Sequence, residues 1–223
     1  MSRAIAVLRP EPGNAATARR VEQAGRTALR LPLFASRALD WTPPDPAAFD
    51  ALILTSANAA RLAGDSLKTL TGLPVYAVGE ASAAAARAAG LSVAYVGTGD
   101  AAALTAHAER DGIRRALFLC GREHRLQPGG IVAQAIPVYA ADPLPVDIAA
   151  LTDTVALLHS ARAATCLATL AGPARAAIAI AAISPAVAEA AGPGWASVAI
   201  APAPSDDALI ASAIALRDCL AMR

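Results

Sequence analysis

The sequence predicts an α/β protein with two similar domains, each a parallel sheet flanked by helices. Short apolar runs alternate with longer helical segments along the chain of 223 residues, which is typical of a parallel sheet covered on both faces. The chain also repeats itself at a spacing of about 105 residues, and two Pro-rich stretches occupy matched places in the two halves. A chain of this length is sufficient for two domains of about 100 residues each.

Each element follows from a local pattern of apolar and helix-forming residues. In the first half we expect strands at 4–8, 28–31, 51–54, 75–78, 93–96 and 116–119, and helices at 14–24, 58–67, 80–89 and 101–110. In the second half we expect strands at 136–138, 155–158, 177–180 and 198–200, and helices at 127–134, 162–170, 185–191 and 206–222. The last helix has an apolar stripe, which predicts one buried face: Leu209, Ile210, Ala213, Ile214, Leu216 and Leu220.

The repeat is visible position by position. The stretch "DALILTSANAA" at 50–60 recurs as "DTVALLHSARAA" at 153–164, so that Ser56 matches Ser160. The stretch "VYAVGEASAAAARAAG" from Val75 lies over "IAAISPAVAEAAGPGW" from Ile180, and "LPLF" from Leu31 lies over "IPVY" from Ile136. One α/β unit is therefore present twice.

The Pro-rich stretches at 40–50 and 139–147 predict linkers at 36–45 and 136–144. They cut the chain into three pieces, and the first piece is too small to fold alone. We therefore expect a discontinuous domain 1 of residues 1–35 plus 145–223, and a domain 2 of residues 46–135, with the two linkers running side by side.

Composition excludes several classes of protein. The 19 Lys and Arg residues are balanced by 18 Asp and Glu residues, which argues against nucleic acid as a partner. The most apolar tract, 176–183, is far shorter than the about 20 residues of a membrane span, and the first residues do not resemble a signal peptide. The three cysteines are widely separated, which indicates unpaired thiols in a reducing compartment. We expect a cytoplasmic monomer that does not bind a membrane.

Hydroxyl side chains follow matched strands. Thr55 and Ser56 come after the strand at 51–54, where a helix start offers free N–H groups to an anion. Ser160 and Ser82 repeat the arrangement, so we expect helix starts from both domains to line one cleft that binds carboxylates or phosphates. The alternative is that each serine is a simple N-cap.

Other polar side chains stand at strand ends. The loop "CGREHR" at 120–125 offers Arg122, His124 and Arg125 to an acidic ligand, or is a solvated loop. Tyr139 ends a strand at a domain junction, where its phenol is able to donate a proton or its ring fills a linker. His107 and His159 are interpreted as structural. No His, Cys, Asp or Glu spacing predicts a metal site, and we expect no cofactor.

These stretches together resemble the uroporphyrinogen-III synthase family: "LRPEPGNA", "DALILTSANA", "VGEASAAAARAAG", "LFLCGRE", "IPVY" and "AISPAVAEAAG". The resemblance implies two α/β domains joined by a two-stranded linker. It also implies cofactor-free cyclisation of hydroxymethylbilane, a linear tetrapyrrole with eight carboxylates, to uroporphyrinogen III. Tyr139 aligns with the family's usual tyrosine and would act as proton donor. Substrate contacts are implied at Arg9, Thr55, Ser56, Asn58, Ser82, Arg122, Ser160, Ser184 and Ala186.

Two stretches depart from the family's pattern. The usual "GPTTA" reads "SPAVA" at 184–188, so Ala186 and Val187 replace two hydroxyl side chains. Asn58 stands where the family often has a basic residue. These losses keep an alternative open, a non-catalytic two-domain protein that binds a small polyanion.

Overall fold

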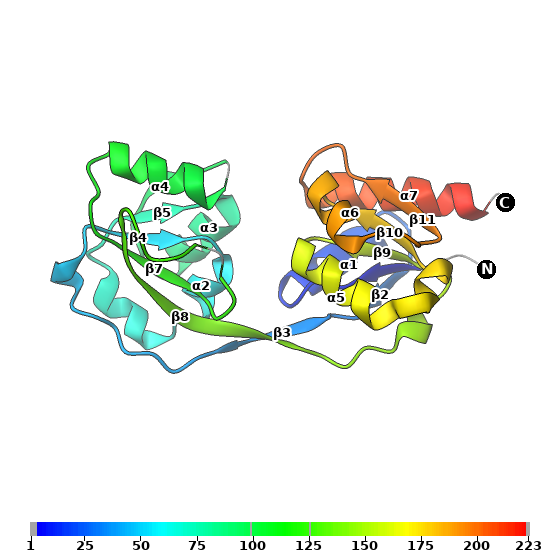
Figure 1. The fold of residues 1–223 in the computed structure, drawn as a ribbon, viewed down its shortest axis with the longest axis horizontal. Helices are drawn as coiled ribbons and strands as arrows, with labels where there is room; N and C mark the ends of the chain where they lie inside the picture. The colour runs from blue at the N-terminus through cyan, green and yellow to red at the C-terminus, as the bar shows by residue number, and fades with distance from the viewer. Residues whose placement is uncertain (1–3, 99, 125, 222–223) are drawn as a thin grey trace. The chain divides into compact units, whose positions relative to one another are not determined.

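The chain divides into two compact units. The structure is a computed structural model that describes residues 4–98, 100–124 and 126–221. Unit 1 combines the described residues up to Ala35 with those from Pro143 onward, and unit 2 is Ser36–Asp142. Each unit is a sheet with helices packed on it (Figure 1). The residues expected as linkers, 36–45 and 136–144, lie in unit 2 except for 143 and 144.

Unit 1 contains a five-stranded parallel sheet in the order β11-β10-β9-β1-β2. Its strands are β1 (Ile5–Val7), β2 (Ala28–Arg30), β9 (Val155–Leu158), β10 (Ala179–Ala182) and β11 (Ser197–Ile200). Its helices are α1 (Gly13–Gln23), α5 (Ala161–Ala171), α6 (Pro185–Ala191) and α7 (Asp206–Ala221), with short 3-10 turns η3 (Ile148–Leu151) and η4 (Gly172–Ala177).

Unit 2 contains a sheet in the order β3-β8-β7-β4-β5-β6, and the pairs from β8 to β6 are parallel. Its strands are β4 (Ala51–Leu54), β5 (Val75–Ala77), β6 (Val93–Val96) and β7 (Ala116–Gly121). Two further strands, β3 (Phe34–Ala38) and β8 (Val132–Pro143), extend across the boundary between the units. The helices are α2 (Ala57–Leu62), α3 (Glu80–Ala88) and α4 (Ala101–Arg110), with 3-10 turns η1 (Pro46–Ala48) and η2 (Asp65–Leu70).

The central strands are buried on both faces, which explains why they read as continuous apolar runs. In β4, Leu52 and Leu54 join a core with residues of α2 and α3, whereas Ala51 and Ile53 join a second core with residues of α4. Alternate side chains of a strand point to opposite faces, so one short segment contributes to two helix–sheet interfaces. In unit 1, α1 and α7 pack on the face that carries Ile5 and Val7.

The repeat corresponds to a shared sheet order. Unit 2 runs β4-α2-β5-α3-β6-α4-β7, and its sheet reads β7-β4-β5-β6. Unit 1 runs β9-α5-β10-α6-β11-α7, and its sheet reads β1-β9-β10-β11. The place of β7 is thus taken in unit 1 by β1, which comes from the start of the chain.

Two expected helices differ from the structure, and one strand was not expected. The helix expected at 127–134 is wrong: Gly129 and Gly130 have positive φ, Gly129 bridges to Val132, and β8 begins there. The helix expected at 58–67 ends at Leu62, because Gly64 has φ 68° and a 3-10 turn follows. Residues 34–38 form strand β3, which the sequence did not predict.

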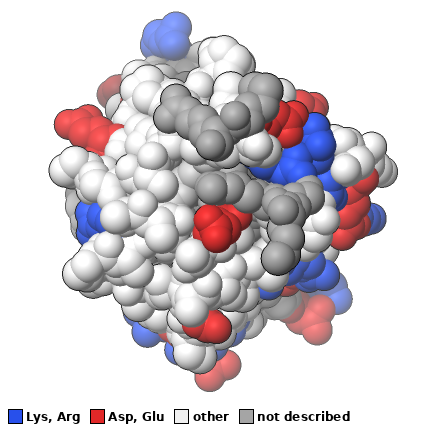
Figure 2. Space-filling model, turned by 90° about the vertical axis from the view of Figure 1, so that its right-hand side faces the viewer, with Lys and Arg blue, Asp and Glu red and all other residues white. Residues whose placement is uncertain are grey.

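Charged side chains of both signs are interspersed on the surface. Figure 2 shows Lys and Arg side chains separated from one another by acidic and uncharged surface on the face it draws. This agrees with the near balance of 19 basic and 18 acidic residues in the chain.

Candidate functional site

The residues expected to bind substrate in unit 1 lie at one edge of its sheet. Arg9 follows β1, Ser160 follows β9 and Ser184 follows β10, and these three strands are parallel neighbours. The carboxyl ends of parallel strands meet at one edge, where open α/β sheets bind ligands. Ser160 caps α5 by accepting a hydrogen bond from the N–H of Ala163 at 3.2 Å.

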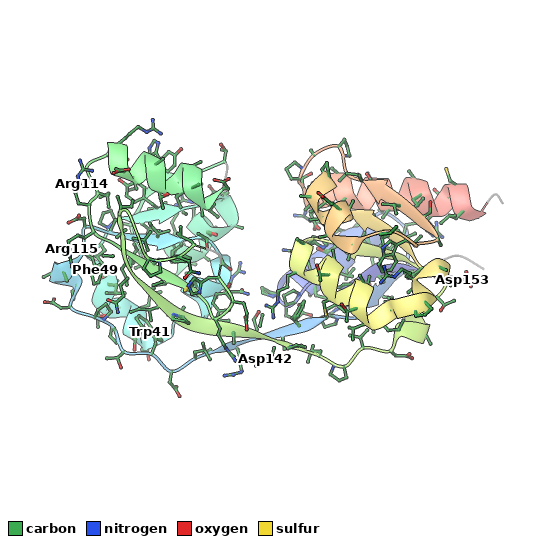
Figure 3. The ribbon with its side chains drawn as sticks, viewed as in Figure 1. Trp41, Phe49, Arg114, Arg115, Asp142 and Asp153 are labelled. Atoms are coloured by element: carbon green, nitrogen blue, oxygen red, sulfur yellow. The ribbon has the colours of Figure 1, made fainter. Side chains whose placement is uncertain are left out.

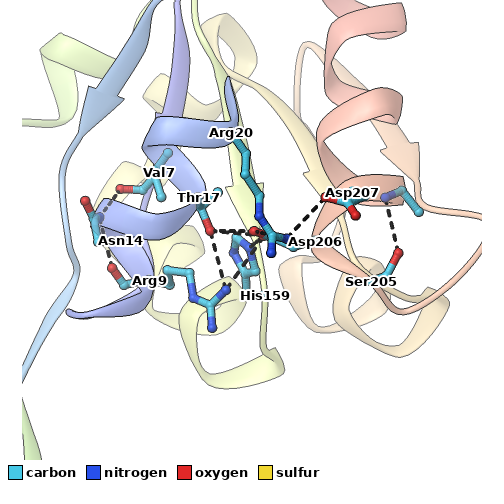
Figure 4. Close-up of polar contacts among 10 residues, drawn as sticks. Val7, Arg9, Asn14, Thr17, Arg20, His159, Ser205, Asp206 and Asp207 are labelled. Carbon is cyan, nitrogen blue, oxygen red and sulfur yellow. Dashed lines mark hydrogen bonds and ion pairs between the residues drawn. The ribbon is translucent and has the colours of Figure 1, made fainter. Parts of the chain in front are cut away.

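A partly buried carboxylate, Asp206, contacts several residues at this edge (Figure 4). The hydroxyl of Thr17 lies 2.9 and 3.0 Å from its two oxygens, and His159 Nε2 lies 2.8 Å from Oδ1. Arg20 Nη1 approaches Oδ2 at 3.3 Å, and Arg9 Nη1 lies 3.7 Å from Oδ1. Asp206 therefore connects α1, α7 and the loops that follow β1 and β9.

The charges of this cluster follow from its contacts. Burial on its own raises the pKa of Asp206, but hydrogen bonds from His159 and Thr17 and the charge of Arg9 outweigh it, so the pKa lies below its usual value. Burial lowers the pKa of His159, although Asp206 opposes that shift. A neutral His159 that donates from Nε2 has a bare Nδ1, and Nδ1 finds no hydrogen-bond partner among the described residues.

The loop that holds Arg9 is fixed from two sides. Asn14 is fully buried, and its Nδ2 donates to the carbonyls of Val7 at 2.7 Å and Arg9 at 3.0 Å. The guanidinium of Arg9 lies against Gly13, where an added Cβ would be 2.4 Å from Nε. It also reaches the hydroxyl of Thr17 at 3.4 Å. Arg9 therefore has a defined position while its side chain remains 37% exposed.

Unit 2 presents a comparable edge. Thr55 and Ser56 follow β4, and Arg122 follows β7, the parallel neighbour of β4. Ser56 caps α2 by accepting from the N–H of Asn58 at 3.2 Å, and Asn58 Nδ2 donates to the hydroxyl of Ser36 at 3.0 Å. Asn58 therefore already binds β3 through its side chain.

Ser82 is a correction to the expected set of substrate contacts. It lies in the first turn of α3 but is only 4% exposed, and the N-cap of that helix is Gly79. The serine side chain lies inside unit 2 because α3, which follows β5, packs against the core. It is not available to a ligand.

Arg122 lies beside an open groove of about 760 Å³ in unit 2. The groove is lined by Arg37, Trp41, Ile136 and seven other residues besides Arg122. Both guanidinium groups bind Asp142, with Arg122 Nη2 at 3.2 Å from Oδ1, and the hydrogen bond from Arg37 contributes most to lowering the pKa of Asp142. Arg125, from the same expected loop, lies outside the described residues.

Tyr139 lies on β8 beside the carboxyl end of β7. It is paired in register with Gly121, and its carbonyl accepts from the N–H of Arg122 at 2.8 Å. The ring packs partly against the core of unit 2 and is half-buried. Its phenol therefore reaches the same edge as Thr55 and Arg122.

The opposite edge of unit 2 is occupied by structural contacts. Asp50 Oδ2 accepts from the N–H groups of Arg114 at 2.9 Å and Arg115 at 2.8 Å, and these bonds lower the pKa of Asp50. Figure 3 shows both arginines near Phe49, away from Asp142. This edge joins the strand starts, so the carboxyl edge is the one left for a ligand.

Comparison with known proteins identifies the family. A family model described as uroporphyrinogen-III synthase HemD matches residues 15–211. The chain belongs to the uroporphyrinogen-III synthase family. Members of this family are cyclising lyases of tetrapyrrole synthesis, and the chain has the function of a haem-biosynthesis enzyme. No curated protein matches the chain.

Two solved structures of such synthases share the fold. The uroporphyrinogen-III synthetase of Helicobacter pylori 26695 is 19% identical, with a TM-score of 0.63 over 99% of this chain and 100% of that one. A mutant uroporphyrinogen III synthase of the extremely thermophilic bacterium Thermus thermophilus is 16% identical, with a TM-score of 0.58 over 99% and 100%. Both therefore contain sheets flanked by helices as in this chain.

The described residues contain neither a membrane-spanning helix nor a cluster of metal ligands. None of the helices within residues 4–98, 100–124 and 126–221 is long and apolar enough to cross a membrane. Within the same residues, His, Cys, Asp and Glu side chains form no group of three that could hold a metal ion.

The departures from the family's pattern at 184–188 include one exposed position and one buried position. Ser184 is the N-cap of α6, although its side chain makes no capping hydrogen bond in the described structure. Ala186 is exposed, whereas Val187 is 6% exposed and belongs to the interior. Only the missing hydroxyl at Ala186 therefore removes a group that a ligand could reach.

The sequence did not predict Asp206 or Thr17, nor that the expected structural role of His159 is a hydrogen bond to Asp206. His159 and Asp206 are separated by 47 positions, and Asp206 lies over Ala101 in the repeat, so the first half contains no matching acid. The available signal was its place in the first turn of the last helix, after a strand of the predicted sheet.

Proposed function

We propose that this chain cyclises hydroxymethylbilane to uroporphyrinogen III, with inversion of ring D and loss of water. The family match over residues 15–211 supports this reaction. The structural observation behind it is Tyr139, a half-buried phenol beside the carboxyl end of β7.

The phenol of Tyr139 assists departure of the terminal hydroxyl. Its proton passes to that hydroxyl, which leaves as water with the electrons of the C–O bond, and the pyrrole that remains is a cation. Attack on this cation by the substituted carbon of ring D gives a spiro intermediate, which rearranges to the inverted macrocycle. A proton lost from carbon then balances the one that Tyr139 donated. Positioning contributes much of the rate because the reacting carbons belong to one molecule.

Each unit, taken by itself, offers groups for carboxylate arms at the carboxyl edge of its sheet. In unit 1, Arg9 supplies a guanidinium whose position Asp206 and Thr17 fix. The amides at the start of α5, behind Ser160, face the same edge, and the dipole of an 11-residue helix favours an anion there. In unit 2, Thr55, Ser56 and Arg122 occupy the equivalent edge.

The second candidate is a protein that binds a small polyanion without turning it over. The observation that favours it is Ala186, an exposed position without the hydroxyl that the family pattern has there. Calorimetry would show tight binding of uroporphyrinogen III while the isomer ratio equals that of buffer.

An isomer assay tests the proposal. Purified protein is given hydroxymethylbilane, the products are oxidised, and the isomers are separated. We expect type III, because buffer alone yields the uninverted type I; type I alone would rule the proposal out. Tyr139→Phe should lower turnover while product affinity stays nearly unchanged, and unchanged turnover would remove Tyr139 from the mechanism.

We also propose that the chain acts as a cytoplasmic monomer. The unpaired cysteines are typical of a reducing compartment such as the cytoplasm. Light scattering of the purified protein should give a mass near 22.4 kDa, and a dimer mass would contradict it.

A further inference from the structure

Tyr139 depends on a glycine for its place. A Cβ on Gly121 would lie 2.8 Å from Cζ of Tyr139 and 3.0 Å from both Cε2 and the hydroxyl oxygen. Carbon atoms in contact are normally about 3.5–4.0 Å apart, so the phenol end of the ring occupies the space of a side chain. Among the described glycines, only Gly121 and Gly13 meet another residue within 3.0 Å in this way.

The backbone at Gly121 does not itself require glycine. Gly121 is absent from the residues with positive φ, unlike Gly129 and Gly130, and it is the last residue of a buried strand. An alanine is able to adopt an extended strand conformation without strain. What a methyl group would displace is therefore the ring of Tyr139.

The surrounding backbone cannot yield in place of the ring. The register shifts between Cys120 and Gly121, so that Cys120 pairs with Pro137 and Gly121 pairs with Tyr139. Such an irregularity redirects a side chain. Val138 and Ala140 on either side of Tyr139 are fully buried, and the N–H of Arg122 holds the carbonyl of Tyr139 at 2.8 Å.

We propose that Gly121 is a positioning residue for Tyr139. The ring packs on the open face of Gly121, which holds the hydroxyl beside the end of β7. The proposal rests on the proposed function for its catalytic consequence. Its structural content, the seating of the ring, is independent of activity.

The test is Gly121→Ala in two backgrounds. In the wild-type background the displaced phenol should lower kcat by about 10- to 100-fold, since misplacing a group by 1 Å costs about that much, while KM and product affinity stay within about twofold. In the Tyr139→Phe background the same change should leave kcat within about twofold, because the donated proton is already absent. An equal loss in both backgrounds would assign Gly121 a general structural role and overturn the proposal.

Gly72→Ala is the matched control. Gly72 is exposed, has no positive φ, and an added Cβ would meet nothing within 4 Å, so kcat should not change. Gly121→Ala should cost less stability in a Tyr139→Ala background than in the wild-type background, because the clash is gone. An equal cost in the two backgrounds would count against the contact between Gly121 and the ring.

A spectroscopic readout separates this proposal from the proposed function. The chain has three tyrosines, so protein labelled with 3-fluorotyrosine gives three fluorine NMR signals, and Tyr139→Phe identifies one of them. Gly121→Ala should shift that signal and leave those of Tyr76 and Tyr95 in place. An unmoved signal overturns the seating whatever the activity. Type I product from the wild-type chain would instead overturn the function, while the fluorine signal still decides the seating.

Discussion

Replacing Asp206 by alanine should destabilise unit 1 by about 3 to 4 kcal/mol. The carboxylate accepts a hydrogen bond from His159 at 2.8 Å and from Thr17 at 2.9 Å. A hydrogen bond to a charged group contributes about 1.5–3 kcal/mol, and the partial burial of Asp206 places each near the lower end. Arg20 is half-exposed, so its ion pair adds little. Alanine also leaves a buried donor on His159 unpaired, which accounts for the remainder.

The assay follows Trp195, the tryptophan of unit 1. The chain has two tryptophans, Trp195 in unit 1 and Trp41 in unit 2. Trp195 is buried and its Nε1 donates to the carbonyl of Ala191 at 3.2 Å, so unfolding of unit 1 should change its fluorescence. Trp41→Phe leaves Trp195 as the only tryptophan, and urea titration of that protein with and without Asp206→Ala gives the change in free energy of unfolding.

Asp207→Ala is the matched control. It is the next residue of α7, but its side chain is 83% exposed and pairs only with half-exposed Arg20, so its removal should cost less than about 0.5 kcal/mol. Equal costs for Asp206→Ala and Asp207→Ala would refute the reasoning, because both changes remove one negative charge from the same helix start.

Three further outcomes are expected. The pKa of His159 is lowered in the folded chain, so the unfolded chain takes up a proton at higher pH than the folded chain does. Unit 1 should therefore lose stability as the pH falls below about 6.5, by at most about 1.4 kcal/mol per pH unit. His159→Gln should flatten this pH dependence in the Trp195 titration, and an unchanged slope would assign the dependence to another group. Ser160→Ala should cost about 1 kcal/mol because it removes a side-chain cap, whereas Ser184→Ala should cost less than half of that in the same assay; equal costs would contradict the capping assignment. Burial raises the pKa of the Cys120 thiol to about 12. Ellman's reagent at pH 8 should therefore modify exposed Cys219 in the native protein and react with Cys120 only in urea. Rapid labelling of Cys120 in the native protein would show that β7 opens.

The repeat predicted more of the fold than composition or periodicity did. It paired Ser56 with Ser160, and both cap a helix after a central strand. It also paired Asp100 with Ser205, and these accept from the N–H groups of Ala103 and Ala208. Helix caps depend on residues only a few positions apart, so one sequence is enough to predict them.

Features that depend on distant partners were not predictable in the same way. The pairing of His159 with Asp206 requires α7 to return beside β9. The packing of the Tyr139 ring on Gly121 requires the register shift between β7 and β8. The helix expected at 127–134 failed because two glycines with positive φ turn the chain into β8, although the apolar spacing there also fits a helix.

The origin of β1 constrains how the chain is made. Ile5 and Ala6 pair with Val155 and Ala156, residues that leave the ribosome about 150 positions later. At about 5–20 residues per second the strand waits roughly 8 to 30 seconds for its neighbour. During that interval every segment of unit 2 has been translated, while β1 has β2 as its one available strand partner and its other edge waits for β9.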